Sequence, residues 1–188
     1  MSCSGHEHPF AVFLIDLNRF RQITKSLGMW AGNKVLIETA ERLCAVFGEK
    51  DFVARLGADK FVAVVPYLNQ EGRAEDVVHA IHQCMNKVFQ VDGHELFVKA
   101  SVGVSFYPKD GQKWDELFKN AESALYSAKV NGGCSYQAYK PEMDTRGKER
   151  LIMETALYHA LEKKQFVLHY QPQFDLFSGR IIGAEALV

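Results

Sequence analysis

The sequence predicts an α+β fold in which a mainly antiparallel sheet is covered by helices. Stretches with the composition of β-strands alternate with stretches whose apolar residues recur every three or four positions. Their order is strand, helix, helix, strand, strand, helix, strand, helix, strand. Two of the strands are separated by only three residues, which is typical of a hairpin and therefore of antiparallel pairing. This order indicates a ferredoxin-like sandwich.

Each element has a local signal. The apolar run Phe10–Ile15 has the length of a buried strand and is followed by Asp16. Gly28 ends the first helix, and Gly57-Ala58-Asp59 forms the turn of the hairpin. The other expected elements are two helices within residues 18–47, hairpin strands over 52–56 and 60–66, a helix over 74–89, a strand over 96–107, a helix over 114–130 and a strand over 134–139.

The last part of the chain has a separate pattern. A helix over 151–164 precedes two β-rich runs, 166–173 and 180–188, joined by a Ser178-Gly179 turn. These two runs carry more apolar surface than an isolated hairpin can bury. We therefore expect a flexible N-terminus over 1–9, a first domain over 10–140, a linker over 141–150 and the truncated start of a second domain over 151–188.

Composition excludes several classes of function. The 188 residues carry a net charge of -1, so no overall basic field indicates a nucleic-acid partner or an anionic membrane. The apolar runs are far shorter than the roughly 20 residues of a membrane helix. The four cysteines are scattered and form no Cys-x-x-Cys pair, as in reduced proteins. We expect a cytoplasmic protein with no nucleic-acid partner and no membrane contact.

Two carboxylates at strand ends are candidates for chemistry. If the strands that carry Asp16 and Asp59 are neighbours, these side chains converge, and a divalent metal can bridge them to a phosphate. On spacing alone, two solvated carboxylates at strand ends are the favoured interpretation. By the same residue-level reasoning, Lys60 is a surface lysine, and Lys129 is a cation favoured by the C-terminus of its helix.

Four segments, in register, resemble a GGDEF (diguanylate cyclase) domain. They are Phe13–Phe20, Arg55–Phe61, Ala100–Ser105 and Ala121–Lys129. This resemblance implies the nucleotide-cyclase type of palm fold from about residue 10 to residue 139. It also implies that two GTP-loaded domains face each other as a homodimer, and that each 3′-hydroxyl attacks the α-phosphate of the other GTP, with loss of pyrophosphate.

The resemblance assigns roles to individual residues. Asp16, the carbonyl of Leu17 and Asp59 would hold Mg²⁺ or Mn²⁺ if the site takes up nucleotide. The catalytic signature is Gly57-Ala58-Asp59-Lys60-Phe61, with Asp59 and Lys60 at its third and fourth positions. The nucleotide-binding positions are Arg21, Thr24, Asn33, Gly57 and Lys129.

The signature departs from the family pattern at two positions. Ala58 replaces a glycine in a loop whose backbone approaches the nucleotide, and alanine tolerates positive φ poorly. Lys60 replaces an acidic residue and disfavours a metal beside it. Thr24 and Asn33 stand where the family has an asparagine and an aspartate that contact guanine, and Asn33 offers one acceptor oxygen where a carboxylate offers two.

The final segments resemble the opening of an EAL domain, the family of cyclic di-GMP phosphodiesterases. Phe166–Gln173 matches its first strand, and Gly183–Leu187 includes Glu185, which corresponds to the metal-binding glutamate of its motif. Only the first helix and two strands of such a domain are present.

Three functional hypotheses remain open. The chain is a degenerate, catalytically inactive regulatory domain that binds GTP and modulates its own EAL domain. Alternatively, it is a weakly active diguanylate cyclase that uses Asp16 and Asp59 with one metal, or a nucleotide-free dimerisation domain. A ferredoxin-like RNA-binding sheet is disfavoured by the near-neutral charge.

Overall fold

The computed structural model describes residues 8–130 and 135–188, with no side chains described for residues 146–148, 150 and 151. The chain separates into two compact units. The first ends at Asp144, and the second begins at Thr145.

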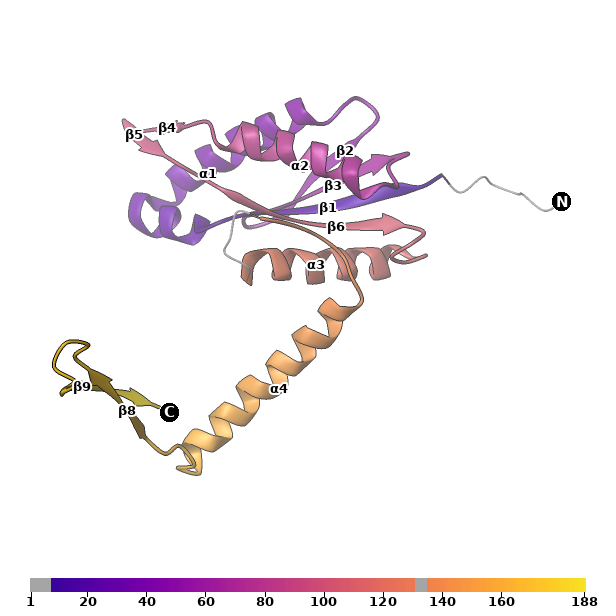
Figure 1. Cartoon of the computed structure of the whole chain (residues 1–188). Helices are drawn as coiled ribbons and strands as arrows, with labels where there is room; N and C mark the ends of the chain where they lie inside the picture. The colour runs from indigo at the N-terminus through magenta and orange to yellow at the C-terminus, as the bar shows by residue number, and fades with distance from the viewer. Residues whose placement is uncertain (1–7, 131–134) are drawn as a thin grey trace. The chain divides into compact units, whose positions relative to one another are not determined.

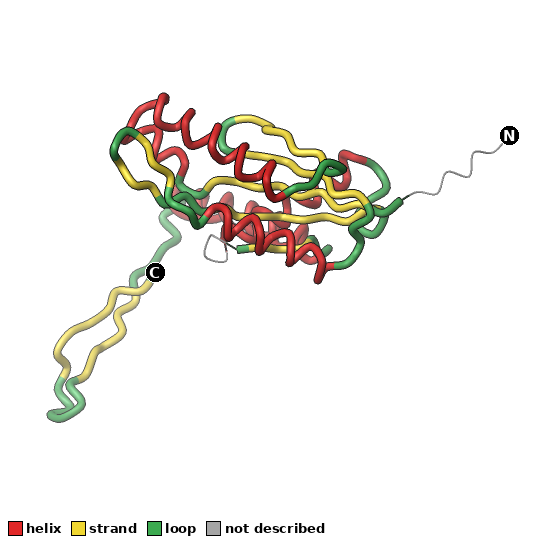
Figure 2. The backbone as a smooth tube through the Cα atoms, turned by 90° about the horizontal axis from the view of Figure 1, so that it is seen from above, coloured by secondary structure: helices red, strands yellow, loops and turns green. Residues whose placement is uncertain are grey.

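A five-stranded sheet forms the centre of the first unit and confirms the predicted α+β class (Figure 2). Its order is β2-β3-β1-β6-β7, and every pairing is antiparallel except that of β6 with β7. The strands are β1 (Phe10–Leu17), β2 (Phe52–Gly57), β3 (Lys60–Pro66), β6 (Ala100–Tyr107) and β7 (Tyr136–Ala138). Because β1 lies in the middle, all its residues after Phe10 are buried.

Three helices cover the two faces of this sheet. Figure 1 shows α1 (Phe20–Val46) and α2 (Glu71–Met85) on one face and α3 (Trp114–Val130) on the other. Successive residues of a strand point to opposite faces, so Phe13 and Ile15 join the core under α1 and α2. Val12 and Leu14 pack with Leu117 of α3. β1 thus contributes side chains to the hydrophobic cores on both faces of the sheet.

Some element boundaries differ from the sequence-based expectation. The helix expected to reach residue 89 ends at Met85, and Phe89 instead starts β4 (Phe89–Val91), which pairs with β5 (His94–Leu96). The strand expected over residues 96–107 is divided, because β5 ends before β6 begins at Ala100. The expected flexible terminus includes Pro9, whose carbonyl accepts a hydrogen bond from the Tyr67 amide at 2.7 Å.

The segment expected to be a linker begins a helix. α4 (Glu142–Glu162) starts at Glu142 rather than at residue 151. Within the first unit, Asp144 in its first turn accepts hydrogen bonds from Ser123 at 2.9 Å and from Tyr139 at 3.3 Å. Acidic residues in a first turn also favour helix formation. These contacts explain why the helix begins at Glu142, before the expected start at residue 151, whereas the role of residues 141–150 as a linker stays a prediction.

The second unit contains the rest of α4 and a hairpin of β8 (His169–Phe174) and β9 (Ile181–Leu187). Its turn includes Gly179 with φ 67°, and the Ser178 amide donates to the Asp175 carboxylate at 2.7 Å. Ile181 and Ile182 are 65% and 70% exposed. Within the described residues, no helix is long and apolar enough to cross a membrane.

Candidate functional site

An open cavity of about 780 Å³ lies where β1 ends and α1 begins. Figure 1 shows the ends of β1 and α3 and the start of α1 at the same end of the domain. The lining combines acidic, basic and apolar residues: Asp16, Leu17, Asn18, Arg19, Phe20, Arg21, Gln22, Ile23, Asp59, Phe97, Lys99 and Lys129.

Strand register brings the two predicted carboxylates to this cavity. Asp16 pairs with Lys60 of β3 and, on its other side, with Ser101 of β6. The Leu17 amide donates a hydrogen bond to the Asp59 carbonyl at 3.1 Å. The predicted convergence of Asp16 and Asp59 is therefore confirmed as geometry, because the hairpin turn lies directly beside the end of β1.

Lys129 forms an ion pair with Asp16, the buried one of the two carboxylates. Its Nζ lies 2.6 Å from Oδ1 of Asp16, a residue that is only 3% exposed. Burial raises the pKa of Asp16 above its ordinary value, while the hydrogen bond and charge of Lys129 oppose that rise. Lys129 can contact Asp16 because it lies in the last turn of α3, and α3 packs along the sheet towards the end of β1.

The hairpin turn is held by an arginine. Nε and Nη2 of Arg55 donate to the carbonyl of Ala58 at 3.2 and 2.8 Å. Gly57 has φ 140° and Ala58 has φ 46°, so alanine occupies a left-handed conformation here. That conformation costs an L-residue roughly 1–2 kcal/mol, and the two hydrogen bonds from Arg55 offset part of it.

The Lys60 side chain pairs with a carboxylate of α3. Its Nζ lies 3.3 Å from Oε1 of Glu122 on α3, and both side chains are nearly half exposed. It does not line the cavity, and neither do Gly57, Ala58 or Phe61. Of the five signature residues from Gly57 to Phe61, only Asp59 lines the cavity.

The family model described as "Diguanylate cyclase, GGDEF domain" matches residues 1–134. The chain belongs to the GGDEF family. The curated protein YkoW of Bacillus subtilis, a signaling protein, is 38% identical over 94% of this chain. Two Pseudomonas aeruginosa proteins match 95% and 100% of it, namely the bifunctional diguanylate cyclase/cyclic di-GMP phosphodiesterase MucR at 36% identity and the cyclic di-GMP phosphodiesterase NbdA at 38%. The chain spans about a quarter of the length of these relatives, at 22%, 26% and 24%.

Solved GGDEF structures share the fold of the first unit. A GGDEF-only structure of PA1120 from P. aeruginosa has a TM-score of 0.73 at 28% identity, covering 76% of this chain and 84% of that one. An EAL/GGDEF domain protein from M. capsulatus has a TM-score of 0.68 at 29% identity, covering 73% and 88%. These structural matches therefore support the GGDEF fold of the first unit.

The residues at the expected guanine positions lie outside the cavity lining of this GGDEF domain. The chain turns at Gly28 of α1, where φ is 84°, so that Thr24 packs against Gly32. The Thr24 hydroxyl donates to the Arg21 carbonyl at 3.0 Å, and Asn33 is exposed. Their base-reading role stays a prediction, and the geometry adds no support for it.

Arg19, Phe97 and Lys99 are among the lining residues that were given no role by the sequence alone. Arg19 was visible only as part of a motif, while Phe97 and Lys99 had no motif signal. The Asn18 amide donates to the Lys99 carbonyl at 2.7 Å, which brings the loop before β6 beside the start of α1. The antiparallel pairing of β1 with β6, which the sequence analysis did not predict, places the start of β6 beside the end of β1.

The donors at this site fit a divalent metal poorly. GGDEF domains in general depend on Mg²⁺ or Mn²⁺, and the metal role of Asp16, Leu17 and Asp59 stays a prediction. Yet the described residues hold no group of three His, Cys, Asp or Glu side chains that could bind a metal. One of the two carboxylates, Asp16, already pairs with Lys129. A lysine occupies the fourth position of the Gly-Gly-Asp-Glu-Phe signature, which removes a further carboxylate.

Proposed function

We propose that this GGDEF domain binds GTP without converting it and serves as a regulatory domain of a longer cyclic di-GMP signalling protein. The single observation that carries this proposal is the position of Lys60. The side chain at the fourth signature position is a cation that pairs with Glu122 outside the cavity.

Binding and turnover make different demands on the site. Binding of a triphosphate needs cations, and Arg21 and Lys129 lie in the cavity lining. Turnover also needs a deprotonated 3′-hydroxyl and stabilisation of charge at the reacting phosphate. With Lys60 turned to α3 and Asp16 held by Lys129, the only carboxylate of the lining outside an ion pair among the described residues is that of Asp59.

The regulated partner is the chain's own EAL domain. The hairpin of β8 and β9 resembles the opening of such a domain in sequence, and Glu185 lies on β9 opposite Gln171. The apolar side chains of this hairpin are exposed, which favours a further protein surface that covers them. The match to MucR and NbdA along nearly the whole chain supports this reading.

Calorimetric titration with GTP tests the binding half of the proposal. We expect saturable binding in the micromolar range, and about tenfold weaker binding by Arg21→Ala, because a charge-assisted contact to phosphate is lost. The matched control is Lys113→Ala, an exposed lysine in the loop before α3, which should bind GTP like the parent chain. Absence of binding up to millimolar GTP would contradict the proposal.

A weakly active cyclase is the second candidate. It is favoured by one observation, the convergence of Asp16 and Asp59 on the same cavity. In that case Asp59→Ala would abolish formation of cyclic di-GMP, whereas a purely regulatory domain forms none before or after the substitution.

A further inference from the structure

The charges in the cavity favour a polyanion more strongly than a metal–nucleotide complex. Four basic residues, Arg19, Arg21, Lys99 and Lys129, face two carboxylates. Lys129 neutralises one of these carboxylates directly, at 2.6 Å from Asp16. The remaining side chains therefore leave an excess of positive charge in a concave site, which concentrates anions there.

Three of the cations are available to a ligand. Within the described part of the chain, Arg19, Arg21 and Lys99 take part in no ion pair, and all three are exposed. Their backbones are nevertheless fixed. Lys99 is anchored by the hydrogen bond from Asn18 to its carbonyl, and the Arg19 carbonyl accepts a hydrogen bond from the Gln22 amide at 2.9 Å. Anchored backbones with free guanidinium and ammonium groups suit phosphate binding.

The residues expected to contact guanine do not line this cavity. Thr24 uses its hydroxyl on the Arg21 carbonyl, and neither Thr24 nor Asn33 lines the cavity. The lining has instead an aromatic ring, Phe97, that is 72% exposed. Stacking on an aromatic ring tolerates every base, because each base has a π-face.

We propose that the cavity is a metal-independent site for polyphosphates, indifferent to the base, in which Lys99 is a phosphate-binding residue. This inference rests on the proposed function and extends it. The ligand is then any linear polyphosphate, of which GTP is one example. Basic side chains take the place of the divalent cation in neutralising the phosphates. Lys99 contributes from the loop before β6, opposite the arginines at the start of α1.

Titration with three probes tests the ligand class. GTP, ATP and inorganic tripolyphosphate are each titrated into the full chain, once with chelator and once with Mg²⁺. The proposal predicts that all three bind in chelator, that GTP and ATP agree within about threefold, and that added salt weakens all of them. If GTP binds but ATP and tripolyphosphate do not, this inference is overturned and the proposed function stays intact. Binding that requires Mg²⁺ would also overturn it, and no binding of any probe would overturn both.

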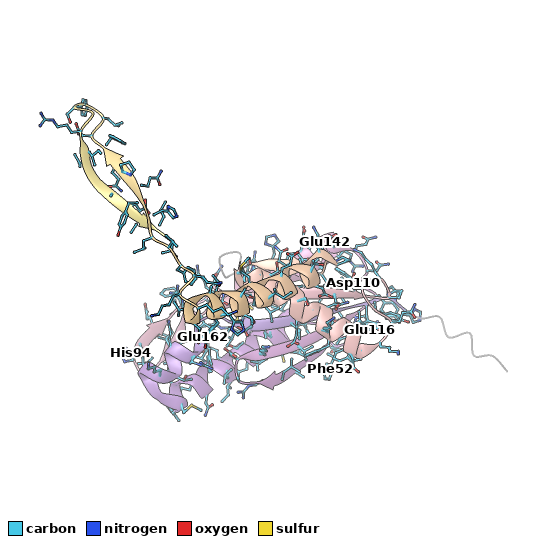
Figure 3. All side chains as sticks on the ribbon, turned by 90° about the horizontal axis from the view of Figure 1, so that it is seen from below. Phe52, His94, Asp110, Glu116, Glu142 and Glu162 are labelled. Atoms are coloured by element: carbon cyan, nitrogen blue, oxygen red, sulfur yellow. The ribbon has the colours of Figure 1, made fainter. Side chains whose placement is uncertain are left out.

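Two substitutions test the named residues. Lys99→Ala should weaken binding of all three probes by about five- to tenfold, because it removes one cation contact. Phe97→Ala should weaken GTP and ATP while leaving tripolyphosphate unchanged, since only nucleotides have a base to stack. The control is Lys113→Ala, which alters a lysine between Asp110 and Glu116, two residues labelled in Figure 3 near the start of α3. Parent-like circular dichroism of each variant ensures a folded sample, and a Lys99→Ala variant with unchanged affinities would overturn the assignment of Lys99.

Discussion

Gly103→Ala is expected to destabilise the first unit by about 3 kcal/mol or more. A Cβ atom at Gly103 would lie 2.2 Å from the Leu125 nitrogen and 2.4 Å from the Ala121 oxygen. Both are backbone atoms of α3, so no side-chain rotation relieves the overlap and the helix must move away from the sheet. The same movement would displace Lys129 from Asp16, because Lys129 lies at the end of α3.

Urea unfolding followed by tryptophan fluorescence measures this effect, since Trp114 stands at the first position of α3. The matched control is Gly72→Ala in α2, where an added Cβ meets nothing within 4 Å. That substitution should leave stability unchanged or raise it by up to about 1 kcal/mol, because alanine is the better helix former. Equal urea midpoints for Gly103→Ala and Gly72→Ala would contradict the close packing of α3 on β6.

Arg42→Ala should cost about 2–4 kcal/mol of unfolding free energy, less than the sum of the contacts it removes. Arg42 donates to three backbone carbonyls at the end of α2 and just beyond it, those of Cys84 at 3.0 Å, Lys87 at 2.6 Å and Val88 at 2.7 Å. Its guanidinium also lies 3.7 Å from the centre of the Phe89 ring. The substitution leaves these carbonyls without their charged donor in a partly buried place.

Chemical denaturation of Arg42→Ala and Arg73→Ala distinguishes a specific contact from a general loss of charge. Arg73 is exposed on the same helix α2 that Arg42 caps, and within the described residues it has no ion pair. We expect Arg73→Ala to change stability by no more than about 0.5 kcal/mol. Similar losses of unfolding free energy in both variants would contradict a specific role of Arg42 at the end of α2.

Local patterns predicted most of the fold. The alternation of apolar runs located the strands of the main sheet, and the glycine at position 28 marked the turn within α1. The end of α2 was missed because residues 74–89 keep a helical period of apolar residues, whereas the actual end is set by Arg42 from another helix. Long-range contacts of this kind leave no periodic signal in the sequence.

The candidate site was predictable only in part. Asp16, Arg21, Asp59 and Lys129 were found because motifs carry them, and all four line the cavity. Lys99 has no motif and reaches the cavity through the pairing of β1 with β6. The direction of Lys60 was not predictable either, since it depends on Glu122, which lies far away in the chain and reaches Lys60 only when α3 packs on the sheet.

The most direct test of the central claim is a product assay under conditions that favour self-association. The chain is incubated at high concentration with GTP and Mg²⁺, then with Mn²⁺, and cyclic di-GMP is quantified by chromatography against an active GGDEF protein. We expect that GTP binds and that no cyclic di-GMP accumulates, because the fourth signature position holds a lysine, which pairs with Glu122 outside the cavity. Accumulation of cyclic di-GMP that disappears in Asp59→Ala would contradict the account and establish an active cyclase.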